Sequence, residues 1–588
     1  MRTALSAIFS RHRAVPGWAP NVVTAFLFLL FLRLGSAMVS GIEDCDETFN
    51  YWEPLHYLVF GYGFQTWEYS PQFALRSYVF LLPYSVVAKI GSMVSLGSKG
   101  PAEIKYNAFL AVRFAQAFAC AAAETYLYDS VIWRFGKPAA RLLLALLMAA
   151  PGLFRASVEL LPSSFAMIGV CAATAAWLVG EFQLAVLGIA VAAVMGWPFA
   201  AVLGLPMSFH ITYRKGILQF MQWMFSDGLV LAFTCFIVDT RFYGRFTLAP
   251  ANLVIYNVLP AQGAGPTAFG VEDWKYYVFN MVLNLNVSAL LLVLYPLLWI
   301  WDGLVADAWP TRQDALTRLI FLSPAFIWLF VMFNQPHKEE RFLAPVYPLV
   351  ALVSAVSLDD VLRIVFGLSR NLSESSRKYR VIVKNLFCLA VVCVAFALGA
   401  SRMLAVIKGY SAPMKIYTHL STLELQYGEG PRSKALPQDV YNICVGKEWY
   451  RFPSNFFLPS SQFRLRFIKS EFSGLLPKEF AESGRGTQRT PPGMNMYNEE
   501  DPAQYFNDTL ACHYFVELDL EESVSGTTPT NPIPPEARAA IWEEDFLWSE
   551  KSRPFFRAFY VPGWEHQYWT LAKYRIYRNA HLLPFRRN

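Results

Sequence analysis

Charged residues are scarce in this chain. Asp, Glu, Lys and Arg make up 16% of the 588 residues and hydrophobic residues 55%, whereas a typical soluble domain is roughly 25% charged. A soluble protein of this length would need more charge to cover its surface. The composition therefore predicts a polytopic α-helical membrane protein.

Several sequence features that are typical of other protein classes are also missing. The net charge of +6 is spread along the chain, and no block of Lys and Arg indicates nucleic-acid binding. The eight cysteines show no CxxC pair and no His/Cys spacing typical of zinc. No small-residue cleavage site follows the basic N-terminus, so we expect an uncleaved signal anchor there.

The few charges are distributed unevenly. Residues 1–401 hold 51 of them, about 13% of that part, and residues 402–588 hold 43, about 23%. The second value approaches that of soluble proteins. We predict a cytosolic N-terminus over residues 1–21, a membrane domain over 22–401 and a water-facing C-terminal domain over 402–588.

Long apolar runs fill the first part of the chain. A membrane-spanning helix needs about 20 mostly apolar residues, and roughly eleven runs qualify. They are residues 22–41, 77–97, 106–129, 139–158, 163–180, 183–207, 217–239, 277–300, 317–335, 343–362 and 381–400. The stretch 139–207 is nearly continuous, and we expect Pro151, Pro162 and Pro198 inside it to kink helices rather than end them.

The Lys and Arg residues predict the orientation, because basic loops stay in the cytosol. The cytosolic segments are then the N-terminus and residues 98–105, 210–216 and 363–380. The loop at 41–76, the residues near 337 and the C-terminal domain face the opposite compartment. The basic segment 133–141 also falls on that side, against the rule.

Asn-x-Ser/Thr sites offer a test of this orientation. Asn507 would lie on the non-cytosolic side, Asn371 in the cytosol and Asn286 inside a span. Only Asn507 would then be open to glycosylation.

Carboxylates gather directly after the first apolar run, in "EDCDETFNYWEPLHY". They are Glu43, Asp44, Asp46, Glu47 and Glu53, and Glu68 follows downstream. Apolar residues recur between them at a spacing of three to four, which predicts an amphipathic helix lying in the membrane interface. Asp46 and Glu47 directly precede that helix, partly shielded, where a carboxylate can act as a base. The alternative interpretation is an ordinary solvated loop.

Three stretches carry a resemblance to a known family. Residues 46–71, "DETFNYWEPLHYLVFGYGFQTWEYSP", resemble the first lumenal loop of family 22 glycosyltransferases, which have the GT-C fold. Residues 337–349, "HKEERFLAPVYPL", resemble the family's second signature. Residues 444–459, "CVGKEWYRFPSNFFLP", resemble a segment of its dolichol-pathway α-1,2-mannosyltransferases, which act in the endoplasmic reticulum. The resemblance covers nearly the whole chain.

The resemblance implies a reaction. Such enzymes pass mannose from dolichyl-phosphate mannose to a lipid-linked oligosaccharide on the lumenal side, with inversion and without a cofactor. Inversion by single displacement needs one base and positive charge to stabilise the departing phosphate. Asp46 matches the family's loop carboxylate and is our predicted base, with Glu47 positioning Asp46 or the acceptor. Predicted sugar contacts are Trp52, Glu53, Trp67, Glu68 and Tyr69, with interfacial anchoring as the alternative for the aromatic residues.

A cationic cluster near residue 337 is the predicted binding site for the donor phosphate. It consists of His337, Lys338 and Arg341. Lys338 and Arg341 would share one face of a helix, Arg offering a fork and Lys a point charge. The alternatives are a snorkelling basic cap on a helix end, or pairing of these cations with Glu339 and Glu340.

A divalent metal is the less favoured solution for the phosphate charge. Asp44, Asp46 and Glu47 offer oxygen ligands. No ligand cage is evident from the sequence, and the cationic cluster can carry the same charge. We therefore predict no metal.

Residues 402–588 predict an α+β domain with a small sheet. Strand-like runs occur in "QDVYNICVG", "RLRFIKSEFSG", "ACHYFVELDL" and "AKYRIYR", and residues 481–504 and 523–535 read as loops. Cys444 and Cys512 flank two of these runs, so a disulfide between them is compatible with an oxidising lumen, with Cys45 as a competitor. Whether this domain binds the oligosaccharide or only braces the membrane domain stays open.

Other functions fit less well. A related α-1,6-mannosyltransferase, or an enzyme that builds glycolipid anchors, is the nearest alternative. A lipid or sugar transporter would show charged residues deep inside spans and internal repeats. The charged residues near or inside spans are mainly Glu124, Asp129, Glu159 and Asp227, and no repeat is evident.

Overall fold

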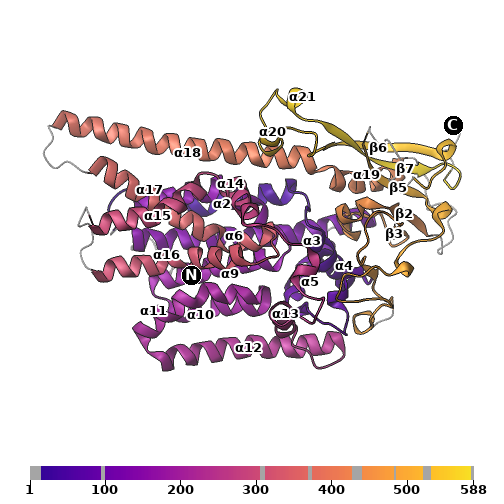
Figure 1. The fold of residues 1–588 in the computed structure, drawn as a ribbon, viewed down its shortest axis with the longest axis horizontal. Coiled ribbons are helices and arrows are strands. Elements are labelled where there is room, and N and C mark those ends of the chain that lie inside the picture. The colour runs from indigo at the N-terminus through magenta and orange to yellow at the C-terminus, as the bar shows by residue number, and fades with distance from the viewer. Residues whose placement is uncertain are drawn as a thin grey trace. The chain divides into compact units, whose positions relative to one another are not determined.

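The computed structural model describes residues 15–94, 100–304, 312–367, 374–426, 440–482, 485–520 and 531–583. The chain forms two compact units (Figure 1). Unit 1 comprises Met1–Ala37, Phe114–Cys235 and Gly270–Met403, and unit 2 comprises Met38–Arg113, Phe236–Phe269 and Leu404–Asn588. The sequence predicted a boundary near residue 401. The structure adds two earlier segments, 38–113 and 236–269, to the C-terminal part.

Unit 1 is helical. Its helices are α7 (Lys137–Ala149), α8 (Pro151–Ala156), α9 (Pro162–Val179), α10 (Phe182–Val191), α11 (Leu205–Lys215), α14 (Trp274–Leu285), α15 (Val287–Leu304), α16 (Arg312–Asn334) and α17 (Tyr347–Gly367). Four further helices have residues in both units: α2 (Val22–Val39), α6 (Pro101–Phe135), α12 (Ile217–Tyr243) and α18 (Glu374–Tyr410). Among the described residues, five helices are long and apolar enough to cross a membrane, or six if the bent pair α14 and α15 counts as one span. These helices confirm the membrane class, and the count of eleven spans stays a prediction.

The span predicted over residues 277–300 is broken rather than continuous. The chain bends by 112° between α14 and α15. Asn286 sits at the bend with φ +43°, and its side-chain Nδ2 donates to the carbonyls of Ala149 (3.1 Å) and Ala395 (3.3 Å). Asn tolerates a left-handed backbone better than most residues, so this residue ends one helix and satisfies carbonyls beside the break.

The prolines end helices rather than kinking them, contrary to the prediction. Pro151 and Pro162 are the first residues of α8 and α9, and Pro198 begins a 3₁₀ turn over Pro198–Gly204. Proline lacks the N–H that would continue a helix and forces the preceding residue out of the helical region. The predicted spans 139–158 and 183–207 therefore each divide into two helices, α7 with α8 and α10 with α11.

Charged residues inside unit 1 are paired. Arg33 is fully buried on α2 and donates from Nη2 to Glu124 of α6 at 2.7 Å and to the Leu147 carbonyl at 2.9 Å. Glu159 accepts from Arg155 at 3.2 Å. The Arg33–Glu124 pair joins α2 to α6, and the Arg155–Glu159 pair is local, so neither acid favours a transport path.

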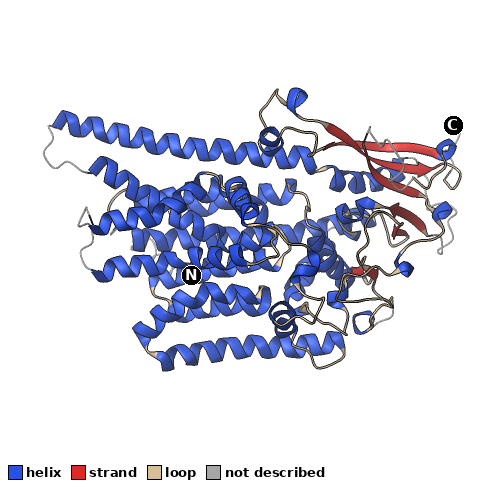
Figure 2. Ribbon diagram, in the orientation of Figure 1, coloured by secondary structure: helices blue, strands red, loops and turns tan. Residues whose placement is uncertain are grey.

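Unit 2 combines helices with a mixed sheet. Its helical segments are α3 (Cys45–Glu47), a π-helical turn (Thr48–Trp52), α4 (Glu53–Phe60), α5 (Tyr78–Val94), α13 (Ala249–Val258), α19 (Ala412–Gln426), α20 (Pro554–Ala558) and α21 (Glu565–Tyr568). Strands β1 (Phe64–Gln65) and β4 (Lys478–Glu479) pair with each other. The other strands are β2 (Tyr441–Val445), β3 (Phe463–Phe467), β5 (Tyr514–Asp519), β6 (Arg538–Leu547) and β7 (Leu571–Asn579). In the described part of the chain they form a five-stranded sheet of order β3-β2-β5-β7-β6 (Figure 2).

The five-stranded sheet lies within residues 402–588, where the sequence predicted a small sheet. Each strand-like run of the sequence contains a strand, and β6 was not foreseen. β2 runs parallel to β3 and β5, whereas β7 is antiparallel to both of its neighbours. A disulfide joins Cys444 in β2 to Cys512, just before β5. Of the two predicted loops, 481–504 contains only short 3₁₀ turns among its described residues, and most of 523–535 lies outside them.

The predicted crossing at 77–97 is wrong. Lys105, which was expected in the cytosol, donates from Nζ to the Asn455 carbonyl at 2.8 Å and to Tyr62 Oη at 3.3 Å. Tyr62 and Asn455 were both predicted on the opposite side, and residues in contact cannot lie on opposite sides of a bilayer. Helix α5, which is only 17 residues long, therefore packs inside unit 2.

Candidate active site

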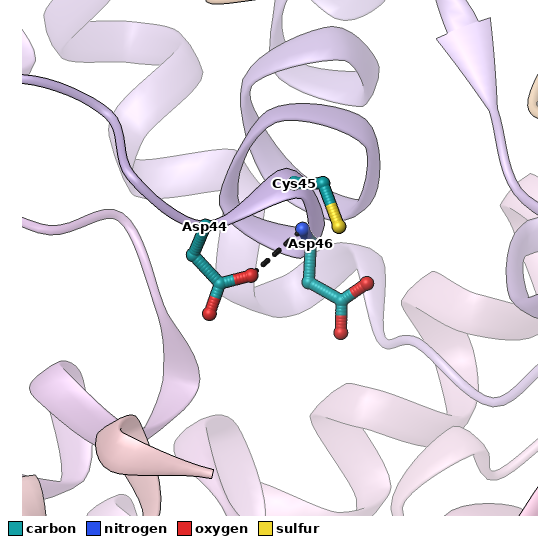
Figure 3. Close-up of side chains that lie close together, drawn as sticks. All are labelled: Asp44, Cys45 and Asp46. Carbon is teal, nitrogen blue, oxygen red and sulfur yellow. Dashed lines mark hydrogen bonds between the residues drawn. The ribbon is translucent and has the colours of Figure 1, made fainter. Parts of the chain in front are cut away.

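The base predicted from the sequence lies on a short helical turn. Asp44 caps that turn, because its side-chain oxygen accepts from the Asp46 backbone N–H at 2.8 Å (Figure 3). An Asp at this position satisfies an N–H that the helix leaves unpaired. Asp46 is partly exposed, just ahead of the π-helical segment. A carboxylate held there by its backbone, and reachable by solvent, suits a base.

The ligand atoms of Asp44, Cys45 and Asp46 all lie within 4.8 Å of one another. Asp44 is already used as a helix cap, and Glu47, the third predicted metal ligand, does not belong to this group. Nothing in this arrangement beyond proximity points to a cation, and the prediction of no metal stays a prediction.

Glu47 is buried and oriented by Trp52. Glu47 is 1% exposed, and its carboxylate accepts from the Trp52 indole N–H at 2.8 Å. The π-helical turn between them explains the contact, because i→i+5 bonding brings residues five apart onto one face. The geometry agrees with a positioning role for Glu47.

The predicted amphipathic interface helix is a helix, but a buried one. Asn50, Glu53 and His56 are as buried as Phe49 and Leu55. Its polar side therefore faces protein rather than water, contrary to the prediction. A hydrophobic period of three to four cannot distinguish this case, because partners from distant segments are invisible in it.

Glu53 is a core residue rather than a sugar contact. It is fully buried, and among the described residues its Oε1 accepts from Ser454 Oγ (2.8 Å) and the Asn455 N–H (2.6 Å). Its Oε2 accepts from Asn455 Nδ2 (2.6 Å) and the Phe64 N–H (2.9 Å). Burial raises the pKa of Glu53, while these donors, Asn455 first, lower it. Because each oxygen accepts two hydrogen bonds, the arrangement fits the ionised carboxylate.

The aromatic residues predicted to contact sugar are also in the core. Trp52 packs on Phe109 with ring centroids 4.4 Å apart, and Trp67 on Tyr256 at 5.2 Å. Tyr69 is fully buried. Neither sugar stacking nor interfacial anchoring describes them, so both sequence interpretations are wrong for these three side chains.

Glu68 alone of that predicted set keeps partial exposure. Its two oxygens accept from Arg76 Nε (3.0 Å) and Nη2 (2.8 Å), a bidentate pair. Arg76 also donates to Tyr51 Oη at 2.7 Å. The sequence analysis did not single out Arg76, although an Arg eight residues after Glu68 was a visible signal.

In unit 1, the predicted phosphate cluster divides into two parts. His337 Nε2 lies 2.8 Å from Glu339 Oε1, and Arg341 pairs with the other oxygen of Glu339. The hydrogen bond to Glu339 raises the pKa of His337 above its ordinary value. Glu339 thereby holds the side chains of His337 and Arg341 next to each other, as the alternative interpretation anticipated.

Lys338 points elsewhere. It is 6% exposed, and its ammonium donates to the carbonyls of Glu272 (2.9 Å) and Gln335. It precedes the 3₁₀ segment Glu340–Val346, so the helix expected to align Lys338 with Arg341 is absent from these described residues. Glu340 accepts from Asn284 at 3.0 Å and pairs with Arg155 at 3.1 Å. Lys338 is therefore a structural lysine in this structure.

Residues 24–459 match the model of the Alg9-like mannosyltransferase family. The chain belongs to this family. The match covers the Asp46 turn, the Glu339 cluster and the segment around Asn455, and it ends just before β3 begins at Phe463.

Relatives in the Alg9-like family are similar along nearly their whole length. The α-1,2-mannosyltransferase ALG9 of Mus musculus is 37% identical, covering 98% of this chain and 92% of that protein. Alg9 of Drosophila melanogaster is 39% identical over 92% of this chain and 85% of its own. ALG9 of Saccharomyces cerevisiae is 34% identical, with 92% of each chain covered.

More distant proteins match less of this Alg9-like chain. GPI mannosyltransferase 3 of Candida albicans is 22% identical over 56% of this chain and 63% of its own. Among solved structures, ArnT from Cupriavidus metallidurans bound to undecaprenyl phosphate has a TM-score of 0.49 at 14% identity, covering 77% of this chain and 86% of that one. That likeness is too distant to support a conclusion about fold or chemistry.

Proposed function

We propose that this protein is an inverting α-1,2-mannosyltransferase that transfers mannose from dolichyl-phosphate mannose to a lipid-linked oligosaccharide during N-glycan precursor assembly. The observation that carries the proposal is the family match over residues 24–459, together with ALG9 relatives 31–39% identical over at least 92% of the chain. The weaker match to GPI mannosyltransferase 3 disfavours a glycolipid-anchor substrate. A GT-C membrane domain is part of this proposal.

In the proposed reaction, a hydroxyl oxygen of the acceptor sugar attacks C1 of the donor mannose. The bond from C1 to the phosphate oxygen breaks, and its electron pair leaves with the dolichyl phosphate. Asp46 takes the hydroxyl proton as general base. One displacement converts a β-linked donor into an α-linked product.

Arg341 and His337 are the residues we assign to the departing phosphate. Their shared partner Glu339 keeps both side chains in place, and His337 carries more positive charge near neutral pH because its pKa is raised. Arg341 adds a fork suited to two phosphate oxygens. The acceptor contacts remain unassigned, since Trp52, Glu53, Trp67 and Tyr69 are buried.

We further propose that Asp46 acts in the lumen of the endoplasmic reticulum. The Asp46 segment and the C-terminal part of the chain belong to one compact unit, joined by Glu53 with Asn455 and by pairing of Phe64–Gln65 with Lys478–Glu479. The disulfide of that unit fits an oxidising compartment.

The membrane topology follows once two predicted spans are revised. In this proposal, residues 77–97 no longer count as a span, and the predicted span 183–207 becomes two, one containing α10 and one containing α11. The number of spans therefore stays at eleven. The basic segment 133–141 then becomes cytosolic, as the charge rule predicts, and residues 98–105 move to the lumenal side. Asn507, exposed in a loop of unit 2, would lie in the lumen. Glycosidase treatment should shift the wild-type protein on a gel but not Asn507→Gln, and an unmodified wild type would contradict this orientation.

The activity is tested with full-length protein in detergent, synthetic dolichyl-phosphate mannose and defined lipid-linked acceptors. We expect transfer of one mannose whose new bond is cleaved by an α-1,2-specific mannosidase, at equal rates with and without chelator. An α-1,6 product would replace the proposed linkage, and no transfer to any acceptor would refute the function.

A further inference from the structure

The helical stretch that runs through α3, the π-helical turn and α4, residues 45–60, is here called the carboxylate helix. It contacts a segment about 400 positions later in the sequence. We call residues Pro453–Phe457 the PSNFF segment. Thr48 Oγ1 on the π-helical turn donates to the Pro453 carbonyl at 3.3 Å. Glu53, at the start of α4, accepts from Ser454 and twice from Asn455. The first turns of the carboxylate helix are thus joined to consecutive residues of this segment, all inside unit 2.

Asn455 is held from both ends. Its backbone N–H and side-chain amide donate to the Glu53 carboxylate at 2.6 Å each, and its carbonyl accepts from Lys105 Nζ at 2.8 Å. Asn455, Glu53 and Lys105 are 3%, 0% and 3% exposed. One asparagine therefore lies between a buried acid and a buried lysine, and both charged groups are shielded from bulk water.

Ring contacts extend this arrangement to the predicted base. Phe456 packs on the Trp52 ring with centroids 5.7 Å apart, and Trp52 lies on Phe109 of α6. The Trp52 indole in turn donates to Glu47, next to Asp46. A chain of direct contacts thus leads from the PSNFF segment to the residue beside the base.

The burial of Glu53 depends on its hydrogen bonds to the PSNFF segment. A buried carboxylate without partners costs several kcal/mol, and removing one member of a buried charged network is strongly destabilising. Glu53 finds three of its hydrogen bonds only when Ser454 and Asn455 are in place. The helix can therefore bury Glu53, and so fix its first turn, only against the PSNFF segment.

We propose that Asn455 and Glu53 are positioning residues that set the location of the base Asp46. This inference rests on the proposed function, since it needs Asp46 to be the base. It also answers the question that the sequence left open: the C-terminal domain supports the catalytic helix directly. Displacement of a reacting group by about 1 Å can cost on the order of 100-fold in rate.

A reciprocal exchange of the two side chains provides the test. In Glu53→Gln, an amide NH₂ replaces one acceptor and faces two donors, the Phe64 N–H and Asn455 Nδ2. In Asn455→Asp, a carboxylate faces the Glu53 carboxylate. In the double variant E53Q/N455D, the amide introduced at position 53 can donate to the carboxylate introduced at position 455, which restores part of the complementarity.

We expect each single variant to lower kcat by at least about tenfold, with KM for the donor within about twofold. The double variant should regain at least about a third of the wild-type kcat. The matched control is Gln567→Glu, which likewise replaces an amide with a carboxylate, at an exposed site of unit 2, with kcat within about twofold of wild type. Ser454→Ala, which removes one hydrogen bond, should lower kcat by a few-fold and remain folded.

The outcomes separate the inference from the function. If wild type transfers mannose but the double variant is no better than the worse single variant, the positioning role is wrong. It is also wrong if Ser454→Ala and the single variants lose only folded protein on size exclusion, with kcat per folded molecule unchanged. If wild type transfers no mannose, the proposed function fails instead.

Discussion

Two short stretches rich in charge bind their partners differently. In the first stretch, residues 43–57, three of the four described hydrogen bonds to Glu53 come from Ser454 and Asn455, 401 and 402 residues away. In the Glu339 cluster, His337 and Arg341 find their partner two residues away on either side. The comparison shows that charged residues can pair with close neighbours in the sequence or with residues of a distant segment. Only pairs of the first kind can be predicted from a short stretch of sequence.

The largest expected effect is at the base. Asp46→Asn keeps the shape of the side chain and removes its ability to take a proton, so kcat should fall by about 10³-fold. Donor KM should stay near the wild-type value. The steady-state assay with defined acceptor measures both. A variant that keeps more than about a tenth of wild-type turnover would show that another residue is the base.

A smaller effect should distinguish Arg341 from Lys338 in the second stretch, residues 337–341. Arg341→Ala should lower kcat by about 100-fold because the charge that we assign to the departing phosphate is lost, and Arg341→Lys should lose less. Lys338→Met should instead lower the melting temperature and leave kcat per folded molecule within about threefold, because its ammonium holds backbone carbonyls. Equal kcat losses at positions 338 and 341 would restore the original three-residue phosphate site.

The smallest expected effect is the pH dependence of His337. Its pKa is raised in the folded protein by Glu339, so its ion pair adds stability fully below the unfolded-state pKa of about 6.5. That contribution is lost as pH rises through the raised folded-state value. Between about pH 6 and pH 8.5, the melting temperature should drop more for wild type than for His337→Gln. Parallel drops in both proteins would mean that the pair adds no stability.

Sequence reasoning succeeded where the evidence was local or compositional. The low charge content predicted membrane helices, strand-like runs predicted four strands, and Glu339 was a foreseen partner for the basic residues two positions away. Cys444 and Cys512 were rightly considered a pair because both flank strand-like runs.

Sequence reasoning failed where distant contacts override a local pattern. Residues 77–97 are apolar enough to resemble a span, yet Lys105, just after them, contacts Tyr62 and Asn455. Trp52, Trp67 and Tyr69 have the composition of a sugar-binding surface, yet they fill a core. Only contacts between distant residues, such as that of Lys105 with Asn455, 350 residues apart, reveal errors of this kind.

The long separation between Glu53 and Asn455 has a consequence for biosynthesis. Because the ribosome makes the acidic helix some 400 residues before its partner, most of the polypeptide must be translated and inserted before that helix can settle. Until then the nascent chain carries an acidic side chain that is costly to bury. Catalytic competence is therefore acquired late, and products of premature termination upstream of Asn455 would be inactive proteins recognised by quality control.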